Sequence, residues 1–178
     1  KSSRITNIAY ISSTGVYGNY NGKWVNENSI LKGKSKKAKN RKLAERQWID
    51  FCFNQKLHYN IFRLGSIYGP DRLNSFGKKK IIIKKEGHYF SRIHVFDISR
   101  LITEILLNGY RNHVWNLVDN MPSSRESYLT DLANFKKIKN YKLVNYKNEQ
   151  KYLKKATKVY WQNNKRVSNL KITKEANL

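Results

Sequence analysis

A strand, a helix and a second strand follow one another early in the sequence, and this order restricts the fold more than any other feature. The apolar run 7–12 ends in hydroxyl residues and glycines, which indicates a buried strand leaving a sheet. Ser35 can cap a helix that runs to about Gln55, and the run 59–64 predicts the second strand. Strand, helix and strand in this order are typical of a right-handed parallel crossover. The sequence therefore predicts an α/β fold.

The predicted helix carries an apolar stripe that we expect to face the core. Ala44, Trp48, Phe51 and Cys52 follow the spacing i, i+4, i+7, i+8. Cys52 is the only cysteine, which excludes a disulfide scaffold and any multi-cysteine metal site. We therefore interpret Cys52 as a core residue.

Further elements are expected along the rest of the chain. The polar segment 20–33 predicts a surface excursion, and the lysine-rich stretch 78–93 is hairpin-like. Asp97 can cap a helix that runs through Asn108, with residues 98, 101, 102 and 105 inward. A strand over 114–118 and a helix over 124–135 follow. We divide the chain into a main domain, residues 1–135, and a basic carboxyl-terminal segment, residues 136–178.

The net charge is +24, from 36 Lys and Arg against 12 Asp and Glu. The excess is mostly lysine, is spread over the whole length and accompanies many asparagines and isoleucines, so a nucleotide bias towards AT-rich codons explains it. No apolar run approaches the roughly 18 residues of a membrane span, so no membrane partner is expected.

Nucleic-acid binding stays open as the less favoured alternative. Residues 134–178 hold thirteen Lys or Arg against two acids, with six aromatic residues among them: Phe135, Tyr141, Tyr146, Tyr152, Tyr160 and Trp161. Basic residues interleaved with aromatics can neutralise phosphates and stack on bases. The other interpretation is that these aromatic rings pack beneath a lobe whose outside is decorated with lysines.

Hydroxyl side chains gather where the first predicted strand ends, at Ser12, Ser13 and Thr14. Ligands of open parallel sheets bind at the carboxyl ends of the strands. A hydroxyl placed there can donate a hydrogen bond to a substrate oxygen as charge develops on it. A purely structural role for this strand end is the alternative.

Five segments, in this order, together resemble the extended short-chain dehydrogenase/reductase superfamily, its NAD-dependent epimerase/dehydratase group and specifically the atypical members. They are SSTGVYG at 12–18 with WVNE at 24–27, RLGSIYGPDR at 63–72, SRIHVFDI at 91–98, WNLVDNMP at 115–122 and RVSNLK at 166–171.

The resemblance implies a partial Rossmann-like parallel sheet with flanking helices and a small carboxyl-terminal substrate-binding lobe. It implies NAD or NADP as cofactor and a small-molecule substrate, such as a nucleotide sugar, that undergoes hydride transfer in the cytoplasm. The family holds the cofactor pyrophosphate on a G-x-G-x-x-G loop, which this sequence lacks. We therefore expect a fragment whose missing amino-terminal half completes the dinucleotide site in the full-length parent. A homodimer is a further option, and the choice between NAD and NADP stays open.

Catalytic residues of the family carry over only in part. Ser13 falls at the position of the family's catalytic serine. The positions of the Tyr-x-x-x-Lys pair hold Lys37 and Arg41, so the usual proton relay is absent. Tyr17 is a candidate to substitute for the missing phenol, or else its ring forms a wall of the pocket. A non-catalytic dinucleotide sensor or scaffold is therefore the alternative to an enzyme.

The resemblance also implies binding residues. Ser12, Leu64, Gly65 and Ser66 are expected beside the cofactor, and a small residue at Gly65 would permit close approach of the backbone.

Arg72 and Arg92 are candidates to bind an anionic group of the substrate. The alternative is that they are solvated or paired with Asp71 or Asp97. His94 is interpreted as a packed core histidine, and the spacing of the histidines does not indicate a metal site.

Overall fold

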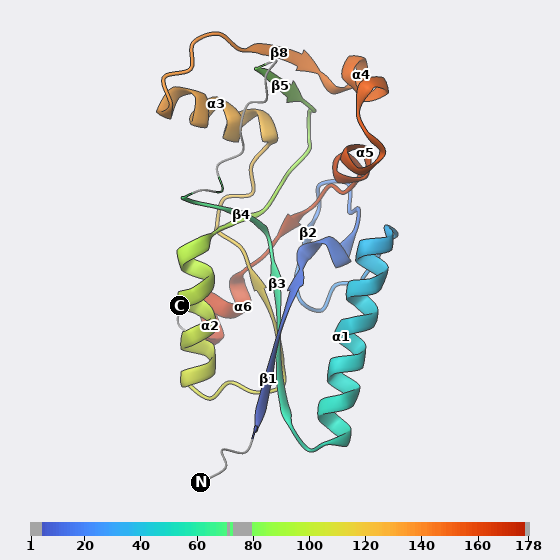
Figure 1. The fold of residues 1–178 in the computed structure, drawn as a ribbon, viewed down its shortest axis with the longest axis vertical. Helices are drawn as coiled ribbons and strands as arrows, with labels where there is room; N and C mark the ends of the chain where they lie inside the picture. Colours follow the sequence, from blue (N-terminus) through green and yellow to red (C-terminus); the bar gives the residue numbers. More distant parts are fainter. Residues whose placement is uncertain (1–4, 71, 73–79, 177–178) are drawn as a thin grey trace.

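Three parallel strands form the centre of the computed structural model, which describes residues 5–70, 72 and 80–176 (Figure 1). The strands are β1 (Asn7–Ser13), β3 (His58–Leu64) and β7 (His113–Leu117), in the order β1-β3-β7. In the register of β1 and β3, residue 7 lies opposite residue 58 and residue 13 opposite residue 64. The expected parallel crossover and the α/β fold class are confirmed.

Helices flank this sheet on two sides (Figure 1). Helix α1 (Lys36–Asn54) lies on one side, and α2 (Val95–Leu107) and α6 (Leu170–Glu175) lie on the other. As expected, the Ser35 side chain caps α1 by accepting a hydrogen bond from the Ala38 N–H. The main core fills the space between β3, β7 and the helices α2 and α6, with Phe62, Trp115 and Ile105 fully buried.

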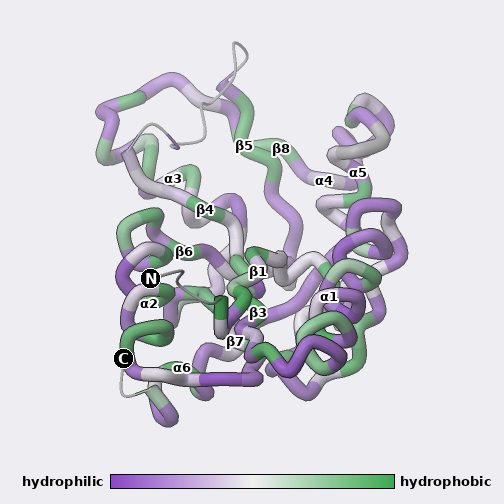
Figure 2. Tube along the Cα trace, turned by 60° about the horizontal axis from the view of Figure 1, so that its bottom comes forward, coloured by the Kyte–Doolittle hydropathy of each residue, from purple (hydrophilic) through white to green (hydrophobic). Residues whose placement is uncertain are grey.

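The buried side of α1 differs from the expected apolar stripe. Its buried residues are Ala38, Glu45 and Cys52, spaced seven apart, so Cys52 is a core residue as expected. Trp48 and Phe51, in contrast, are 38% and 46% exposed. The sequence pattern misplaced the stripe because a charged residue, Glu45, is buried and held by partners inside the protein. Figure 2 shows hydrophobic and hydrophilic residues mixed along α1.

The cap of helix α2 lies three residues before the expected one. Its cap is His94, whose ring accepts a hydrogen bond from the Phe96 N–H at 3.4 Å, while Asp97 lies in the first turn. His94 is therefore half-buried and caps the helix, whereas the sequence had indicated a packed core histidine. Leu101 and Ile105 face the core as expected.

The lysine-rich stretch does not form a hairpin over its described part, residues 80–93. Strand β5 (Ile81–Lys84) pairs in parallel with β8 (Lys142–Asn145), and β6 (Arg92–His94) pairs in parallel with β4 (Ser66–Tyr68). The physical reason is a separate small core, because Ile82 packs against leucines of helix α3 (Arg125–Phe135). Residues 78 and 79 lie outside the described residues.

Segment 20–33 is likewise more than a surface excursion. Strand β2 (Trp24–Val25) pairs in parallel with β9 (Arg166–Val167). Val25 and Val167 pack with Val16 and Tyr17 of the 3-10 helix η1 (Thr14–Tyr17), and all four are buried. The carboxyl-terminal segment therefore packs against the first strand end. Between β8 and β9 lie the helices α4 (Tyr146–Glu149), η2 (Gln150–Tyr152) and α5 (Lys155–Gln162).

Candidate functional site

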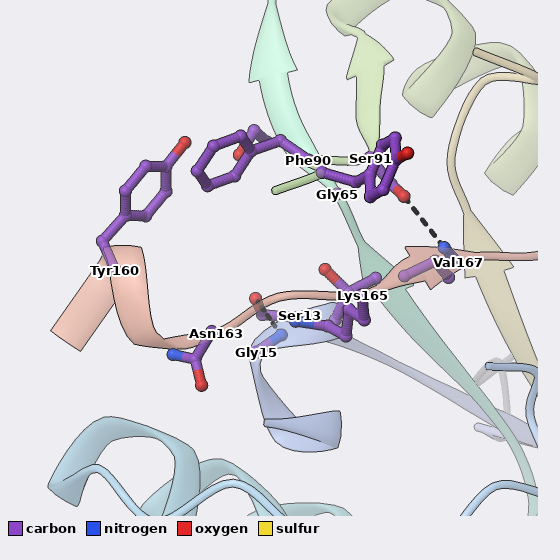
Figure 3. A pocket seen from close by; sticks show the side chains of 12 residues that line it. Ser13, Gly15, Gly65, Phe90, Ser91, Tyr160, Asn163, Lys165 and Val167 are labelled. Carbon is purple, nitrogen blue, oxygen red and sulfur yellow. Dashed lines mark hydrogen bonds between the residues drawn. The ribbon is translucent and has the colours of Figure 1, made fainter. Parts of the chain in front are cut away.

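Two neighbouring strand ends meet at one cavity of about 270 Å³ (Figure 3). Because Ser13 lies opposite Leu64 in the parallel register, Ser13 and Gly65 occupy the same edge of the sheet. Both residues line the cavity, together with Thr14, Gly15 and Ser66. We call it the Ser13 cavity. Carboxyl ends of parallel strands are the usual place for a ligand, so the location agrees with the expected binding edge.

The Ser13 side chain is held in place by the start of η1. Its Oγ caps this 3-10 helix by accepting a hydrogen bond from the Gly15 N–H at 3.1 Å. Since the hydroxyl accepts in this contact, its own O–H remains able to donate towards the cavity.

Gly65 lies where a side chain would not fit. A Cβ atom at this position would approach the Ser91 carbonyl oxygen to 2.8 Å and a methyl of Val118 to 3.0 Å. The neighbouring backbone therefore approaches β3 closely at the cavity, which only glycine permits.

The other walls of the cavity come from later parts of the chain. Residues 89–91 form one wall, and Tyr160, Asn163, Lys165 and Val167 form another. The rings of Phe90 and Tyr160 stack at a centroid distance of 4.4 Å, and the Ser91 Oγ accepts a hydrogen bond from the Val167 N–H at 3.0 Å. No local sequence signal links these residues to the strand ends, although Ser91 and Val167 fall within two of the family-like segments.

Among the described residues that line the cavity, Lys165 is the only cation, and none is Asp or Glu. Its side chain is buried, and this burial lowers the pKa of its amine to about 8. An amine with such a pKa is mostly protonated at pH 7 and readily loses its proton slightly above that pH.

His88 lies beneath the same wall. Its Nε2 is 2.9 Å from the Trp161 carbonyl oxygen, which can only accept, so this nitrogen carries the proton of the neutral ring. Lys85 donates to the same oxygen at 2.6 Å. Burial, with a smaller contribution from the Lys85 charge, lowers the pKa of His88 to about 4, so the ring is neutral at pH 7.

Ser12 and Tyr17 belong to a buried polar network rather than to the lining of the cavity. The Ser12 hydroxyl donates to Glu45, and Arg63 donates to the same carboxylate at 2.8 Å. The Tyr17 hydroxyl donates to Asn116 at 2.7 Å and accepts from Arg63 at 3.0 Å. Burial raises the pKa of Tyr17 above its ordinary value, which makes its phenol a poorer acid.

The other residues predicted to bind cofactor or substrate do not all line the Ser13 cavity. Ser66 lines the cavity, whereas Leu64 is buried in the main core. Arg92 is buried, donates to the Ser123 hydroxyl at 2.6 Å and lies over the Tyr128 ring at 4.2 Å. Arg72 is exposed. Neither arginine is among the residues that line the Ser13 cavity.

Lys37 and Arg41, at the positions of the family's tyrosine and lysine, are both exposed on α1.

Within the described ranges, none of the helices has the length and apolar character needed to cross a bilayer. The same residues include no cluster of three or more His, Cys, Asp or Glu side chains that could hold a metal ion.

Solved structures share this fold. A functionally unknown conserved protein from Silicibacter pomeroyi superposes with a TM-score of 0.89 at 30% identity, over 97% of this chain and 60% of that protein. UDP-glucose 4-epimerase from Thermus thermophilus, in complex with NAD, gives 0.73 at 14% identity, over 96% and 58%. The dTDP-glucose 4,6-dehydratase from Streptomyces venezuelae, with NAD bound, also gives 0.73 at 14% identity, over 96% and 53%.

These similarities establish a Rossmann-like α/β fold of the kind found in NAD-dependent epimerases and dehydratases. The chain spans 60% of the length of the first of these proteins and between one half and three fifths of the other two. No protein-family model and no curated protein matches the sequence.

Proposed function

We propose that this chain forms the carboxyl-terminal half of an NAD- or NADP-dependent enzyme that transfers hydride to or from a small hydroxyl or carbonyl compound, such as a nucleotide sugar. The observation that carries the proposal is the meeting of Ser13 and Gly65 at adjacent strand ends that line one cavity. Similar folds in an epimerase and a dehydratase that hold NAD support this proposal.

The other half of the dinucleotide site would come from polypeptide outside this chain. Among the described residues, β1 pairs with β3 alone, so the outer edge of β1 carries unpaired backbone groups. Ile11 of β1 is 44% exposed. A further strand paired with this edge would bring a glycine-rich phosphate loop to the rim that Ser13 occupies. A dinucleotide bound there supplies or accepts the hydride.

Ser13 would then contact the reacting oxygen of the substrate. Its hydroxyl is held by the Gly15 N–H, so it is oriented before the substrate arrives. A hydroxyl that hydrogen-bonds the oxygen stabilises the charge that develops there during hydride transfer.

The test is Ser13→Ala in the full-length protein, assayed with NADH and NADPH against a panel of nucleotide sugars. We expect turnover to fall about 100-fold, in line with the loss of one donor to a developing oxyanion. The urea unfolding midpoint should fall only slightly, because Ser13 also caps η1 and the loss of a helix cap costs about 1 kcal/mol. Unchanged turnover would refute the role of Ser13, and failure of the unmodified protein to bind either dinucleotide would refute the proposed function.

A non-catalytic dinucleotide-binding protein is the second candidate. It is favoured by the exposed Lys37 and Arg41 of α1, which supply neither the phenol nor a titrating lysine of the family's relay. The quenching of protein fluorescence measures the binding of NADH. If NADH binds but no sugar of the panel is turned over, this candidate is selected over the enzyme.

A further inference from the structure

Lys165 lines the Ser13 cavity, and among the described residues no carboxylate lines the cavity to neutralise its charge. The residue is 9% exposed, and the residues that line the cavity include no Asp or Glu. Among the described residues, none of the ion pairs includes Lys165. An unpaired buried charge is costly, so proteins seldom retain one unless its position serves a ligand or a reaction.

The other buried cations of the structure have partners. Arg63 pairs with Glu45, and Arg92 donates to Ser123 and lies over an aromatic ring. Lys165 therefore stands apart: among the described residues, no ion pair and no hydrogen bond engages its amine.

The backbone on both sides of Lys165 is fixed. On one side, the Asn164 side chain accepts from the Tyr89 N–H at 3.0 Å and donates to the Gly87 carbonyl at 2.8 Å. On the other side, the Val167 N–H donates to the Ser91 Oγ. The backbone of Lys165 is therefore held at the cavity before a ligand binds.

We propose that Lys165 exchanges a proton with the reacting oxygen of the substrate, in the place of the absent tyrosine, while Ser13 donates a hydrogen bond to the same oxygen. This inference rests on the proposed function. As hydride reaches the carbonyl carbon, the π electron pair moves to oxygen, and an O–H bond forms as one N–H bond of the Lys165 ammonium breaks. The neutral amine then regains its proton from water, and oxidation of the alcohol follows the reverse path.

The surroundings of Lys165 suit this exchange. The titratable groups that line the cavity with Lys165 are Tyr89 and Tyr160, and neither is a carboxylate. His88 interacts with the charges of both Lys165 and Lys85, and Lys85 donates to the Trp161 carbonyl oxygen outside the cavity lining. His88, with a pKa of about 4, stays neutral at pH 7 and does not add a second charge. Burial brings the pKa of the Lys165 amine to about 8, and acid–base catalysis is most effective when the pKa lies near the operating pH.

The decisive experiment has two readouts in the full-length protein. The first is an NMR titration of the Cε resonances in 13C-lysine-labelled protein, with the Lys165 signal assigned by its loss in Lys165→Met. We expect a midpoint near pH 8 for Lys165, about two units below an ordinary lysine. A midpoint of 10 or above would overturn the proposal regardless of any activity.

The second readout compares turnover and its pH profile in Lys165→Arg and Lys165→Met. Arginine keeps the charge but does not release its proton, so both variants should lose turnover by about 100- to 10,000-fold. Lys174→Met on the exposed side of α6 is the matched control and should retain full activity. Near-normal turnover in Lys165→Arg, with the alkaline limb of the profile unchanged, would overturn proton exchange.

Dinucleotide binding separates this inference from the proposed function. We expect both Lys165 variants to bind NADH within about twofold of the unmodified protein while turnover is lost, which supports the inference. If the unmodified protein does not bind a dinucleotide, the proposed function fails, whatever the titration of Lys165 shows. If the unmodified protein binds NADH and turns over a substrate, and the Lys165 variants turn over the same substrate, only the proposed role of Lys165 fails.

Discussion

Arg63 on β3 and Glu45 on α1 form an ion pair inside the protein, with the Arg63 Nη2 2.8 Å and the Nε 3.2 Å from the two carboxylate oxygens. Both side chains are almost fully buried. The pair joins the crossover helix to the central strand directly beneath the Ser13 strand end, and Ser12 donates a further hydrogen bond to Glu45. The position of the cavity rim therefore depends on this contact.

We predict that Glu45→Gln destabilises the fold by about 3–5 kcal/mol, because it leaves the Arg63 charge buried without a counter-charge. Urea unfolding measures the effect. Asp50→Asn is the matched control on the same helix, since the Arg46–Asp50 pair is exposed and contributes at most about 1 kcal/mol. Equal losses in the two variants would contradict the structural role of the buried pair.

The lowered pKa of His88 predicts how the free energy of unfolding depends on pH. Its pKa is about 4 in the folded protein, against 6.5 for an unperturbed histidine, so the unfolded chain takes up this proton first as the pH falls. The free energy of unfolding should therefore fall between pH 6.5 and pH 4, by about 3 kcal/mol at about 1.4 kcal/mol per pKa unit. Chemical unfolding over this range measures the slope. His88→Gln should flatten it, and parallel slopes in both proteins would exclude His88 as the source.

Gly65 should not tolerate alanine, because the added methyl would meet backbone atoms of residue 91 and the Val118 side chain. We expect Gly65→Ala to cost about 1–3 kcal/mol and to shift the NMR amide signals of Ser91 and Val118. Gly87→Ala is the control: no atom lies within 4 Å of the place that its methyl would take, so any loss there comes from the positive φ of Gly87 and not from a clash. A Gly65→Ala spectrum unchanged at residues 91 and 118 would contradict the close approach.

The basic carboxyl-terminal segment gives a prediction about nucleic acid. Trp161 is 2% exposed and packs against His88 and Phe90, so its ring is not free to stack on bases. Binding to single-stranded DNA should therefore be electrostatic only and should vanish by about 0.2 M salt. Substitution of the exposed Phe135 and Tyr152 by alanine should not change the affinity. Salt-resistant binding that these substitutions abolish would instead favour a nucleic-acid surface.

The strand ends could be predicted from the sequence, but the walls of the cavity could not. Local signals predict both strands, and a parallel crossover brings their ends to one edge, whereas Gly65 was singled out by the resemblance. Glu45 was missed because a charged residue at a helical position normally indicates a solvated face. Its burial requires Arg63, a partner on another element.

Lys165 was missed for a related reason. It reaches the cavity because β9 pairs with β2, a short two-residue contact that leaves no recognisable periodicity in the sequence. The prediction of a hairpin over 78–93 was wrong for the same reason, because β5 pairs with β8, some sixty residues further along the chain.

The Arg166 side chain donates to the Gly22 carbonyl, across 144 residues of sequence. During synthesis on the ribosome, at about 5–20 residues per second, the three central strands emerge about 2–10 seconds before β9. The sheet edge with Ser13 is thus assembled early, and the wall with Lys165 is added last. A nascent chain stalled before residue 160 would contain both strand ends of the cavity but would lack Lys165 and the part of the main core that α6 supplies.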